Sequence, residues 1–367
     1  MVKGPEVAAE QGHPLTELEE KERREVTRAA VVGATGYAGR ELIAWLARHP
    51  LVGLTHLMAS GRSGTESVPI GDLHPSLRGV SSLPCQPLDT NELRRAEVDV
   101  VFLATPHEPS YDLAPQLLDR GLRVVDLSGA FRLREAEAYA RWYGFDHRAG
   151  SVLREAVYGL PELNRERIAA ARLVANPGCY ATSIILALAP VLRAGWVDDA
   201  AGINCDSKSG ATGAGRTLRD DLLFSNVNEN CRAYGLFAHR HVPEILQALS
   251  LEEGSLTFVP HLLPLTRGIL STVYVRLMRR TELAELQELY RSFYRSSPFV
   301  RVYEATKVPA IQAVAGTPYA DLGFALDPPT GRLVIVSVLD NLGKGGATQA
   351  IENMNLMLGF EQETGLR

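Results

Sequence analysis

Short apolar runs alternate with helical patterns along the first half of the chain. An apolar run at 28–32 ends in a glycine turn, and 40–49 follows with four apolar side chains at helical spacing before Pro50. Further runs at 52–58, 98–103 and 122–126 predict strands, with a helix near 111–119 between the last two. Strands that alternate with helices predict an α/β fold with a doubly wound parallel sheet of the Rossmann type, because the crossovers place helices on both faces.

The pattern changes after about residue 175. Apolar alternation at 254–258, 269–277 and 332–339 predicts longer strands of a mixed sheet, with helices near 244–249 and 283–294. Residues 343–358 indicate a glycine turn followed by an amphipathic helix that returns to the first domain. We therefore expect a Rossmann-type domain from 28–175 and 340–367, an α+β domain from 176–339, and a disordered, mostly charged extension at 1–27.

Composition narrows the class of protein. The 367 residues are 46% hydrophobic and 22% charged, with a net charge of -5, which is ordinary for a globular protein and unlike disordered or fibrous chains. Basic residues are scattered, so we expect no nucleic-acid partner. No run of about 18 apolar residues and no secretion signal is present, so we expect no membrane partner and a cytoplasmic location. The four cysteines form no CxxC pair, and we expect no metal.

Three glycines stand between the first predicted strand and the first predicted helix. Gly33, Gly36 and Gly39 are spaced as GxxGxxG, with Thr35, Tyr37 and Ala38 between them. A backbone without Cβ atoms turns sharply and approaches a pyrophosphate closely, and the N–H groups of the helix start favour the anion. We therefore predict that this loop binds a dinucleotide.

The end of the second predicted strand indicates which dinucleotide is bound. An NAD site usually has an acidic residue there to hold the ribose 2′-hydroxyl. This chain instead has Ser60, Arg62 and Ser63, which suit a 2′-phosphate. The sequence therefore favours NADP.

One cysteine stands out by its position. Cys179 follows the predicted strand at 172–175 and the turn residues Pro177 and Gly178, and a helix begins directly after it. A helix start stabilises a thiolate, and lowering the thiol pKa by about two units, worth roughly 2.7 kcal/mol, would make the thiolate dominant at neutral pH. We predict that Cys179 is a nucleophile. Cys85 in a proline-flanked loop, Cys205 in a strand and Cys231 in a polar loop have no such placement.

A pair of histidines is the candidate acid/base. His239 and His241 flank Arg240 just before a predicted helix. On an extended backbone the two imidazoles would point the same way and Arg240 the opposite way. The sequence does not rank the two histidines.

Eight motifs begin at Gly33, Asp126, Tyr158, Asn176, Ser209, His239, Pro260 and Asp340. In this order they resemble the long form of N-acetyl-gamma-glutamyl-phosphate reductase of arginine biosynthesis, from about residue 28 to the C-terminus. The chain departs from that pattern at Gly129-Ala130, where Ala-Asp is expected, and after Thr317, where Asn is expected.

The resemblance implies an NADPH-dependent reduction of an acyl phosphate to a semialdehyde and phosphate, through a thioester on Cys179. His239 is then the acid/base, with His241 nearby. Arg132, Arg216 and Arg267 are candidates for the substrate's carboxylate and phosphate, without assignment of either end. The same motifs place Asn176 at the substrate and Asn341 at the cofactor. We expect a homodimer or a homotetramer.

Three alternatives remain open at this stage. Aspartate-semialdehyde dehydrogenase and the reductase of carrier-bound aminoadipyl phosphate in lysine biosynthesis share the reaction scheme. A dinucleotide-binding redox sensor without turnover would keep the glycine loop, because fold alone does not prove activity. Such a sensor would have no use for Cys179 and two histidines.

Overall fold

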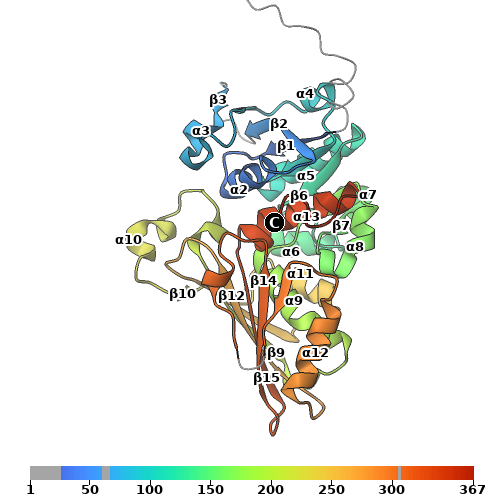
Figure 1. Ribbon diagram of the computed structural model, residues 1–367, viewed down its shortest axis with the longest axis vertical. Helices are drawn as coiled ribbons and strands as arrows, with labels where there is room; N and C mark the ends of the chain where they lie inside the picture. Colours follow the sequence, from blue (N-terminus) through green and yellow to red (C-terminus); the bar gives the residue numbers. More distant parts are fainter. Residues whose placement is uncertain (1–25, 60–66, 305–306) are drawn as a thin grey trace, which may run out of the picture.

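The computed structural model describes residues 26–59, 67–304 and 307–367. They form two units, each built on one sheet (Figure 1). The sheet of the first unit has the strand order β3-β4-β2-β1-β5-β6-β8-β7, and every neighbouring pair is parallel except β3 with β4. Its strands are β1 Thr27–Val32, β2 Val52–Ala59, β3 Val68–Pro69, β4 Pro84–Pro87, β5 Val100–Leu103, β6 Arg123–Asp126, β7 Val157–Tyr158 and β8 Leu173–Ala175.

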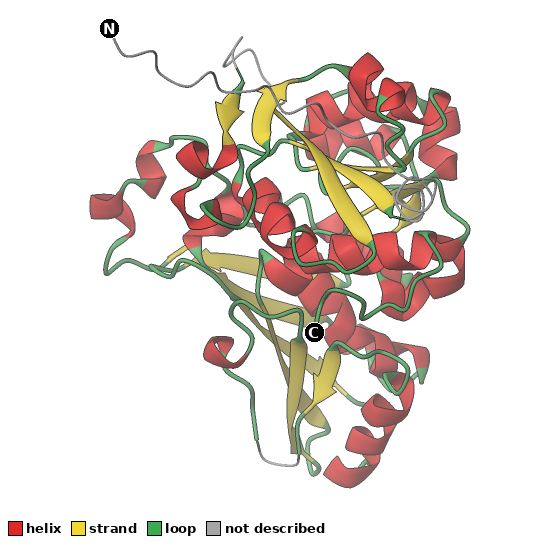
Figure 2. Ribbon diagram, turned by 45° about the horizontal axis from the view of Figure 1, so that its top comes forward, coloured by secondary structure: helices red, strands yellow, loops and turns green. Residues whose placement is uncertain are grey.

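Helices cover both faces of this first sheet (Figure 2). The period of two in β1 explains why: Ala29 and Val31 face one apolar core, and Ala30 and Val32 face another, all fully buried. The expected doubly wound parallel sheet is confirmed. Its helices are α2 Tyr37–Leu46, α3 Ile70–Leu73, α4 Thr90–Arg95, α5 His107–Asp119, α6 Glu137–Tyr143, α7 Gly150–Glu155, α8 Pro161–Ala169 and, from the end of the chain, α13 Thr348–Met357.

The second unit has a mixed sheet, as expected. The strand order is β10-β11-β9-β12-β15-β14-β13, with parallel pairs at β11–β9 and β13–β14 and antiparallel pairs elsewhere. Its strands are β9 Ile203–Ser209, β10 Arg232–Ala233, β11 Leu256–Leu262, β12 Ile269–Arg276, β13 Val300–Val302, β14 Ala320–Asp327 and β15 Arg332–Leu339, and its helices are α9 Cys179–Arg193, α10 Phe224–Val227, α11 Val242–Leu249 and α12 Leu283–Phe293.

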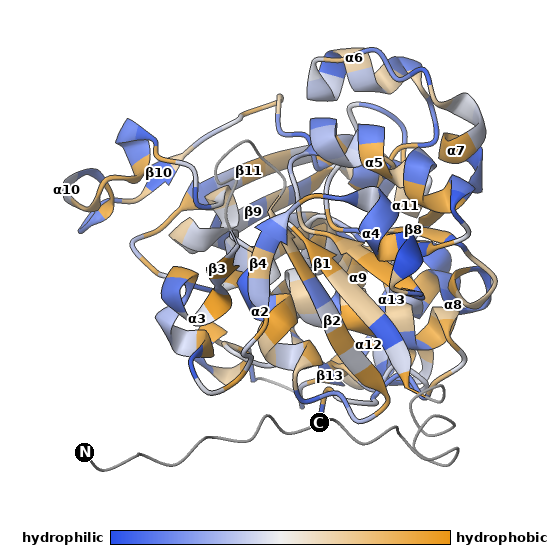
Figure 3. Ribbon diagram, turned by 90° about the horizontal axis from the view of Figure 1, so that it is seen from above, coloured by the Kyte–Doolittle hydropathy of each residue, from blue (hydrophilic) through white to orange (hydrophobic). Residues whose placement is uncertain are grey.

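Helices α9, α11 and α12 pack on one face of this second sheet and enclose its core. The short α10 lies on an arm that projects from the body (Figure 3). None of the helices in the described ranges is long and apolar enough to cross a membrane.

The end of the chain differs in one respect from the expectation. A π-helical turn, Gly343–Ala347, leads into α13, and α13 packs into the core of the first unit. The helix is not amphipathic in its surroundings, since every residue from Thr348 to Met357 is buried. Its polar side chains bond inside the protein, as when Asn353 donates to the Gly159 carbonyl at 2.8 Å.

Candidate active site

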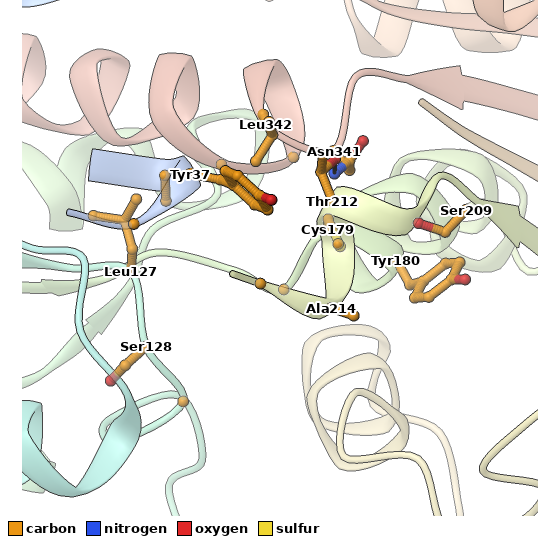
Figure 4. A pocket seen from close by; sticks show the side chains of 18 of the residues that line it. Tyr37, Leu127, Ser128, Cys179, Tyr180, Ser209, Thr212, Ala214, Asn341 and Leu342 are labelled. Atoms are coloured by element: carbon orange, nitrogen blue, oxygen red, sulfur yellow. Dashed lines mark hydrogen bonds between the residues drawn. The ribbon is translucent and has the colours of Figure 1, made fainter. Parts of the chain in front are cut away.

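A cavity of about 1100 Å³ lies between the two units. Figure 4 shows Cys179 in this cavity at the first turn of α9, with Tyr180 beside it and Tyr37, Thr212 and Asn341 close by. The first unit contributes the glycine loop, and the second contributes the two histidines and the segment around Arg216. The structure thus brings together, in one cavity, the predicted residues Gly33, Thr35, Gly36, Tyr37, Ala38, Arg132, Asn176, Cys179, Arg216, His239, His241 and Asn341.

The glycine loop fits a dinucleotide by its geometry. Gly33 has a φ of +90°, and a Cβ there would lie 2.4 Å from the Ala104 carbonyl oxygen. A Cβ at Gly39 would lie 2.3 Å from the Gly33 carbonyl oxygen, so Gly39 serves the packing of α2 and is not among the cavity-lining residues. A Cβ at Gly36 would make only an ordinary contact, 3.5 Å from the Gly33 carbonyl oxygen, and no described side chain caps α2. The uncapped N–H groups at this helix start therefore face a site where an anion can approach. Ser60, Arg62 and Ser63 lie outside the described residues.

Cys179 is the first residue of α9, as the sequence indicates, and the Tyr180 N–H bonds to its sulfur. Contrary to expectation, its thiol pKa is not lowered: burial raises it to about 11, although the charges of Arg132 and Arg240 act in the opposite direction. Desolvation of the thiolate outweighs the helix start here. The resting group is therefore a thiol that must transfer its proton as it reacts.

Glu244, which the sequence arguments missed, organises the residues around Cys179. Its carboxylate is fully buried and accepts hydrogen bonds from the Gly178 N–H at 3.0 Å, from Tyr158 Oη at 3.0 Å and from Arg132 Nη1 at 3.1 Å. It stands in the first turn of α11, three residues after His241. The sequence did contain a signal for Glu244, because it follows His241 by three residues. A helix that starts between them places both side chains on the same side.

The histidine pair lies on a turn rather than on an extended strand. The imidazole centroids of His239 and His241 are nevertheless 4.6 Å apart, and both rings contact the edge or face of the Tyr180 ring. Arg240 does not point away, as an extended backbone would require, but also lines the cavity. The turn conformation of His241, with φ of -82° and ψ of -12°, accounts for the difference.

Both imidazoles are neutral at neutral pH. Burial lowers the pKa of His239 to about 4 and that of His241 well below its usual value, and the Arg240 charge adds to both effects. The His241 backbone N–H donates to His239 Nδ1 at 3.1 Å, so neutral His239 carries its proton on Nε2. His241 Nε2 lies over Gly178 and 4.0 Å from Glu244 Oε1, and its buried Nδ1 has no hydrogen-bond partner among the described residues.

The three predicted substrate arginines occupy different surroundings. Arg132 lines the cavity, but its guanidinium donates to Glu244 and to the carbonyls of Asn176 and Leu127. Arg216 Nη1 donates to the Thr35 carbonyl at 2.7 Å, beside the glycine loop. Arg267 is not among the cavity-lining residues: it forms ion pairs at 2.8 Å with Glu41 of α2 and with Asp340. These ion pairs join the two units. They occupy the Arg267 guanidinium with carboxylates of the protein itself, so it is not open to a substrate carboxylate or phosphate.

Two asparagines connect the cavity to the end of the chain. Asn176 Nδ2 donates to the Gly346 carbonyl at 3.2 Å, and its oxygen accepts from Asn353 of α13 at 3.0 Å. Asn341 Oδ1 accepts from the Gly268 N–H at 2.7 Å, and its Nδ2 donates to Thr212 at 3.0 Å. Both side chains therefore hold the wall of the cavity as well as lining it.

The other cysteines and one departure from the motifs have structural explanations. Cys85 is in β4, not in a loop, and is buried like Cys205 in β9, whereas Cys231 is exposed. Gly129 stands where the motif has Ala because Tyr143 fills the space: a Cβ there would lie 2.1 Å from the Tyr143 ring.

Comparisons with known proteins agree with this geometry. The NAD binding domain of semialdehyde dehydrogenase matches residues 28–171, and the semialdehyde dehydrogenase dimerisation domain matches 179–341. N-acetyl-gamma-glutamyl-phosphate reductase of Desulfotalea psychrophila is 47% identical over 343 residues, or 92% of this chain and 97% of that protein. The enzyme of the same name from Pelotomaculum thermopropionicum is 45% identical, with the same coverage of each chain.

Solved structures show the same fold at low identity. Aspartate semialdehyde dehydrogenase II of Vibrio cholerae superposes with a TM-score of 0.67 at 18% identity, over 91% of this chain and 98% of that one. The aspartate semialdehyde dehydrogenase of Candida albicans, solved with NADP, gives 0.62 at 17% identity, over 90% and 99%. On the identity and coverage of its relatives, the chain belongs to the semialdehyde dehydrogenase family and, within it, to the N-acetyl-gamma-glutamyl-phosphate reductases.

Proposed function

We propose that this chain reduces N-acetyl-gamma-glutamyl phosphate to N-acetylglutamate semialdehyde and phosphate, as a step of arginine biosynthesis, with NADPH as reductant. The observation that carries the proposal is the position of Cys179 at the start of α9, in one cavity with the glycine loop and two neutral imidazoles. Relatives of this name match nearly the whole chain at 44–47% identity, whereas the aspartate semialdehyde dehydrogenases match at 13–22%.

The sulfur of Cys179 attacks the acyl carbon, and the C–O bond to phosphate breaks with its electron pair leaving on phosphate. The product on the enzyme is a thioester. NADPH held at the glycine loop would supply the hydride that reduces the thioester carbon. Reduction leaves a tetrahedral thiohemiacetal oxyanion; the carbonyl re-forms as the C–S bond breaks, which releases the semialdehyde and a Cys179 thiolate that takes back a proton from the protonated imidazole.

Proton transfer assigns different roles to the two histidines. Because burial keeps Cys179 protonated, a neutral base must take its proton, and His241 lies over the preceding residue with Glu244 positioned to stabilise the imidazolium. His239 presents an N–H at Nε2, which suits a hydrogen bond to the substrate oxygen that becomes negative. We therefore propose His241 as the acid/base and His239 as the oxygen-binding donor, an exchange of the roles that the resemblance implied.

Charges around the glycine loop suit the phosphate groups of a dinucleotide. Arg216 lines the cavity and reaches this loop, and the charges of Arg216 and Arg40 both act on His74, which bonds to the Ala34 carbonyl of the loop. Such a cluster suits phosphate groups. The preference for the 2′-phosphate of NADPH is tested at Arg62, which lies outside the described residues. Arg62→Asp should lower the ratio of kcat/KM with NADPH to kcat/KM with NADH. An unchanged ratio would contradict a role of Arg62 in binding the 2′-phosphate.

We further propose 28–175 with 340–367 as the NADP-binding domain and 176–339 as the catalytic and oligomerisation domain of a homodimer or homotetramer. The match of residues 179–341 to a dimerisation domain supports this assembly. Light scattering coupled to gel filtration should give two or four chains per particle, and a monomer at micromolar concentration would contradict it. The cytoplasmic location stays a prediction.

The direct test of the proposed function is the reverse reaction. Purified enzyme should reduce NADP⁺ with N-acetylglutamate semialdehyde and phosphate at a kcat/KM at least a hundredfold above that with aspartate semialdehyde or the aminoadipyl analogue. Equal or greater efficiency with either competitor would assign a different substrate. No NADP⁺ reduction with any of the three would favour a redox sensor.

A further inference from the structure

The charges that line the cavity are unequally compensated. Among the described residues that line the cavity the one carboxylate is Asp221, and it accepts hydrogen bonds from both Arg219 and Arg232 at 2.6 Å. Arg132 is paired with Glu244 at 3.1 Å. These three guanidiniums therefore have their partners within the protein, and an anionic ligand would have to displace a carboxylate to bind them.

Two other arginines line the cavity without an acidic partner among the described residues, and they lie at different ends. Arg216 donates to the carbonyl of Thr35, so it belongs to the end formed by the glycine loop. Arg240 stands between the two histidines, and its side chain makes no hydrogen bond and no ion pair with any described residue. An exposed guanidinium in a cavity wall retains all five of its donors for a ligand.

Arg240 belongs to the wall of the cavity that holds the reacting groups: it stands between His239 and His241, and both of their rings pack against Tyr180, the residue after Cys179. Its charge lowers the pKa of Cys179 and adds to the lowered pKa of both His239 and His241, so it acts on all three groups that the chemistry uses. The buried Nδ1 of His241, which lacks a partner among the described residues, lies in the same wall of the cavity. A ligand bound beside Cys179 would thus meet, in Arg240, a guanidinium without an acidic partner among the described residues.

We propose that Arg240 binds the phosphate group of the acyl phosphate, and inorganic phosphate in the reverse direction. This rests on the proposed function and deepens it. The phosphate is bonded directly to the acyl group that Cys179 attacks, whereas the α-carboxylate lies at the far end of the carbon chain. A guanidinium in the cavity wall that holds Cys179 is therefore placed to bind the phosphate, and it stabilises the negative charge that gathers there as the C–O bond breaks.

Separate half-reactions test this proposal. With semialdehyde and NADP⁺ but no phosphate, the wild-type enzyme should form one NADPH per active site and stop at the thioester. Phosphate should then release the acyl group as acyl phosphate, with return of the thiol. Arg240→Gln should leave the amplitude of the NADPH burst unchanged and raise the KM for phosphate by about ten- to a hundredfold, which corresponds to the loss of a hydrogen bond to a charged group. The KM for semialdehyde should change less than threefold.

Two further variants make the outcome decisive. Arg240→Lys keeps the charge and should recover part of the phosphate KM, while Arg216→Gln should raise the KM for NADP⁺ and leave that for phosphate within threefold. Loss of the burst in Arg240→Gln, or a larger change in the semialdehyde KM than in the phosphate KM, would overturn the assignment. If wild-type enzyme itself gives no burst with this semialdehyde, the proposed function fails first.

Discussion

Gly178→Ala is the substitution that tests most sharply whether His241 works where the structure places it. The backbone at Gly178 has φ of -68° and ψ of 145°, which any residue adopts, so alanine brings no backbone strain. Its Cβ, however, would lie 2.3 Å from His241 Nε2 and 2.6 Å from the two neighbouring ring carbons. Carbon contacts need about 3.5 Å, so the imidazole must move by roughly 1 Å.

The size of the effect follows from that displacement. Misplacement of a catalytic group by about 1 Å can cost about a hundredfold in rate, and we expect kcat to fall by about that factor. Overpacking should also lower the free energy of unfolding by about 1–3 kcal/mol. Affinity for NADP⁺ should change little, because Gly36 and its neighbours lie on the other unit. Steady-state kinetics, cofactor titration and urea unfolding measure the three quantities.

A double-mutant cycle with His241→Ala isolates the cause. If the added methyl group acts by moving the imidazole, Gly178→Ala should slow the His241→Ala enzyme by less than threefold, because no ring is left to move. A full hundredfold loss in both backgrounds would show that the methyl group acts elsewhere. Wild-type kcat in Gly178→Ala alone would refute a catalytic role for His241 in this position.

Three further substitutions test other parts of the account. The folded state keeps His239 neutral down to about pH 4, whereas the unfolded chain protonates this residue below pH 6.5. His239 therefore lowers the free energy of unfolding by up to about 1.4 kcal/mol per pH unit as the pH falls through that window. In urea unfolding, His239→Asn should flatten this pH dependence, and an identical pH dependence would contradict the prediction. Lys344→Met should lower the free energy of unfolding by about 3–5 kcal/mol, because the buried Lys344 Nζ donates at 2.7 Å to both Glu162 and Glu352. The variant that also carries Glu162→Gln and Glu352→Gln should recover most of that stability. No recovery would refute the ion-pair explanation. Arg267→Met should lower the melting temperature, because it removes two ion pairs, while the KM for substrate should change less than threefold. A tenfold rise in that KM would instead show that Arg267 binds the substrate.

The fold was predictable where local pattern and burial agree. The apolar run at β1, the glycine turn and the apolar spacing in α2 lie in one stretch of chain, so the sequence suffices for them. Short edge strands such as β3 and β7, each of two residues, carry too few positions to show a period. The helix α13 looked amphipathic because its polar residues resemble a solvent face, yet they bond within the core.

The site was predictable as a set of residue types but not as a set of partners. The turn before Cys179 places the thiol at a helix start, and that was visible. Its raised pKa depends on burial between two units, which one segment cannot reveal. Likewise, Arg132 and Arg267 looked like ligand-binding arginines because their carboxylate partners, Glu244 and Glu41, are distant in the sequence.

The central claim is that Cys179 carries the acyl group during turnover. Intact-mass spectrometry of the enzyme after incubation with N-acetylglutamate semialdehyde and NADP⁺, without phosphate, tests it most directly. We expect one N-acetylglutamyl adduct per chain, mapped by digestion to the peptide that contains Cys179. It should be absent from Cys179→Ser, present in Cys231→Ser, and removed by added phosphate. NADPH formation without an adduct, or an adduct on any other residue, would contradict it.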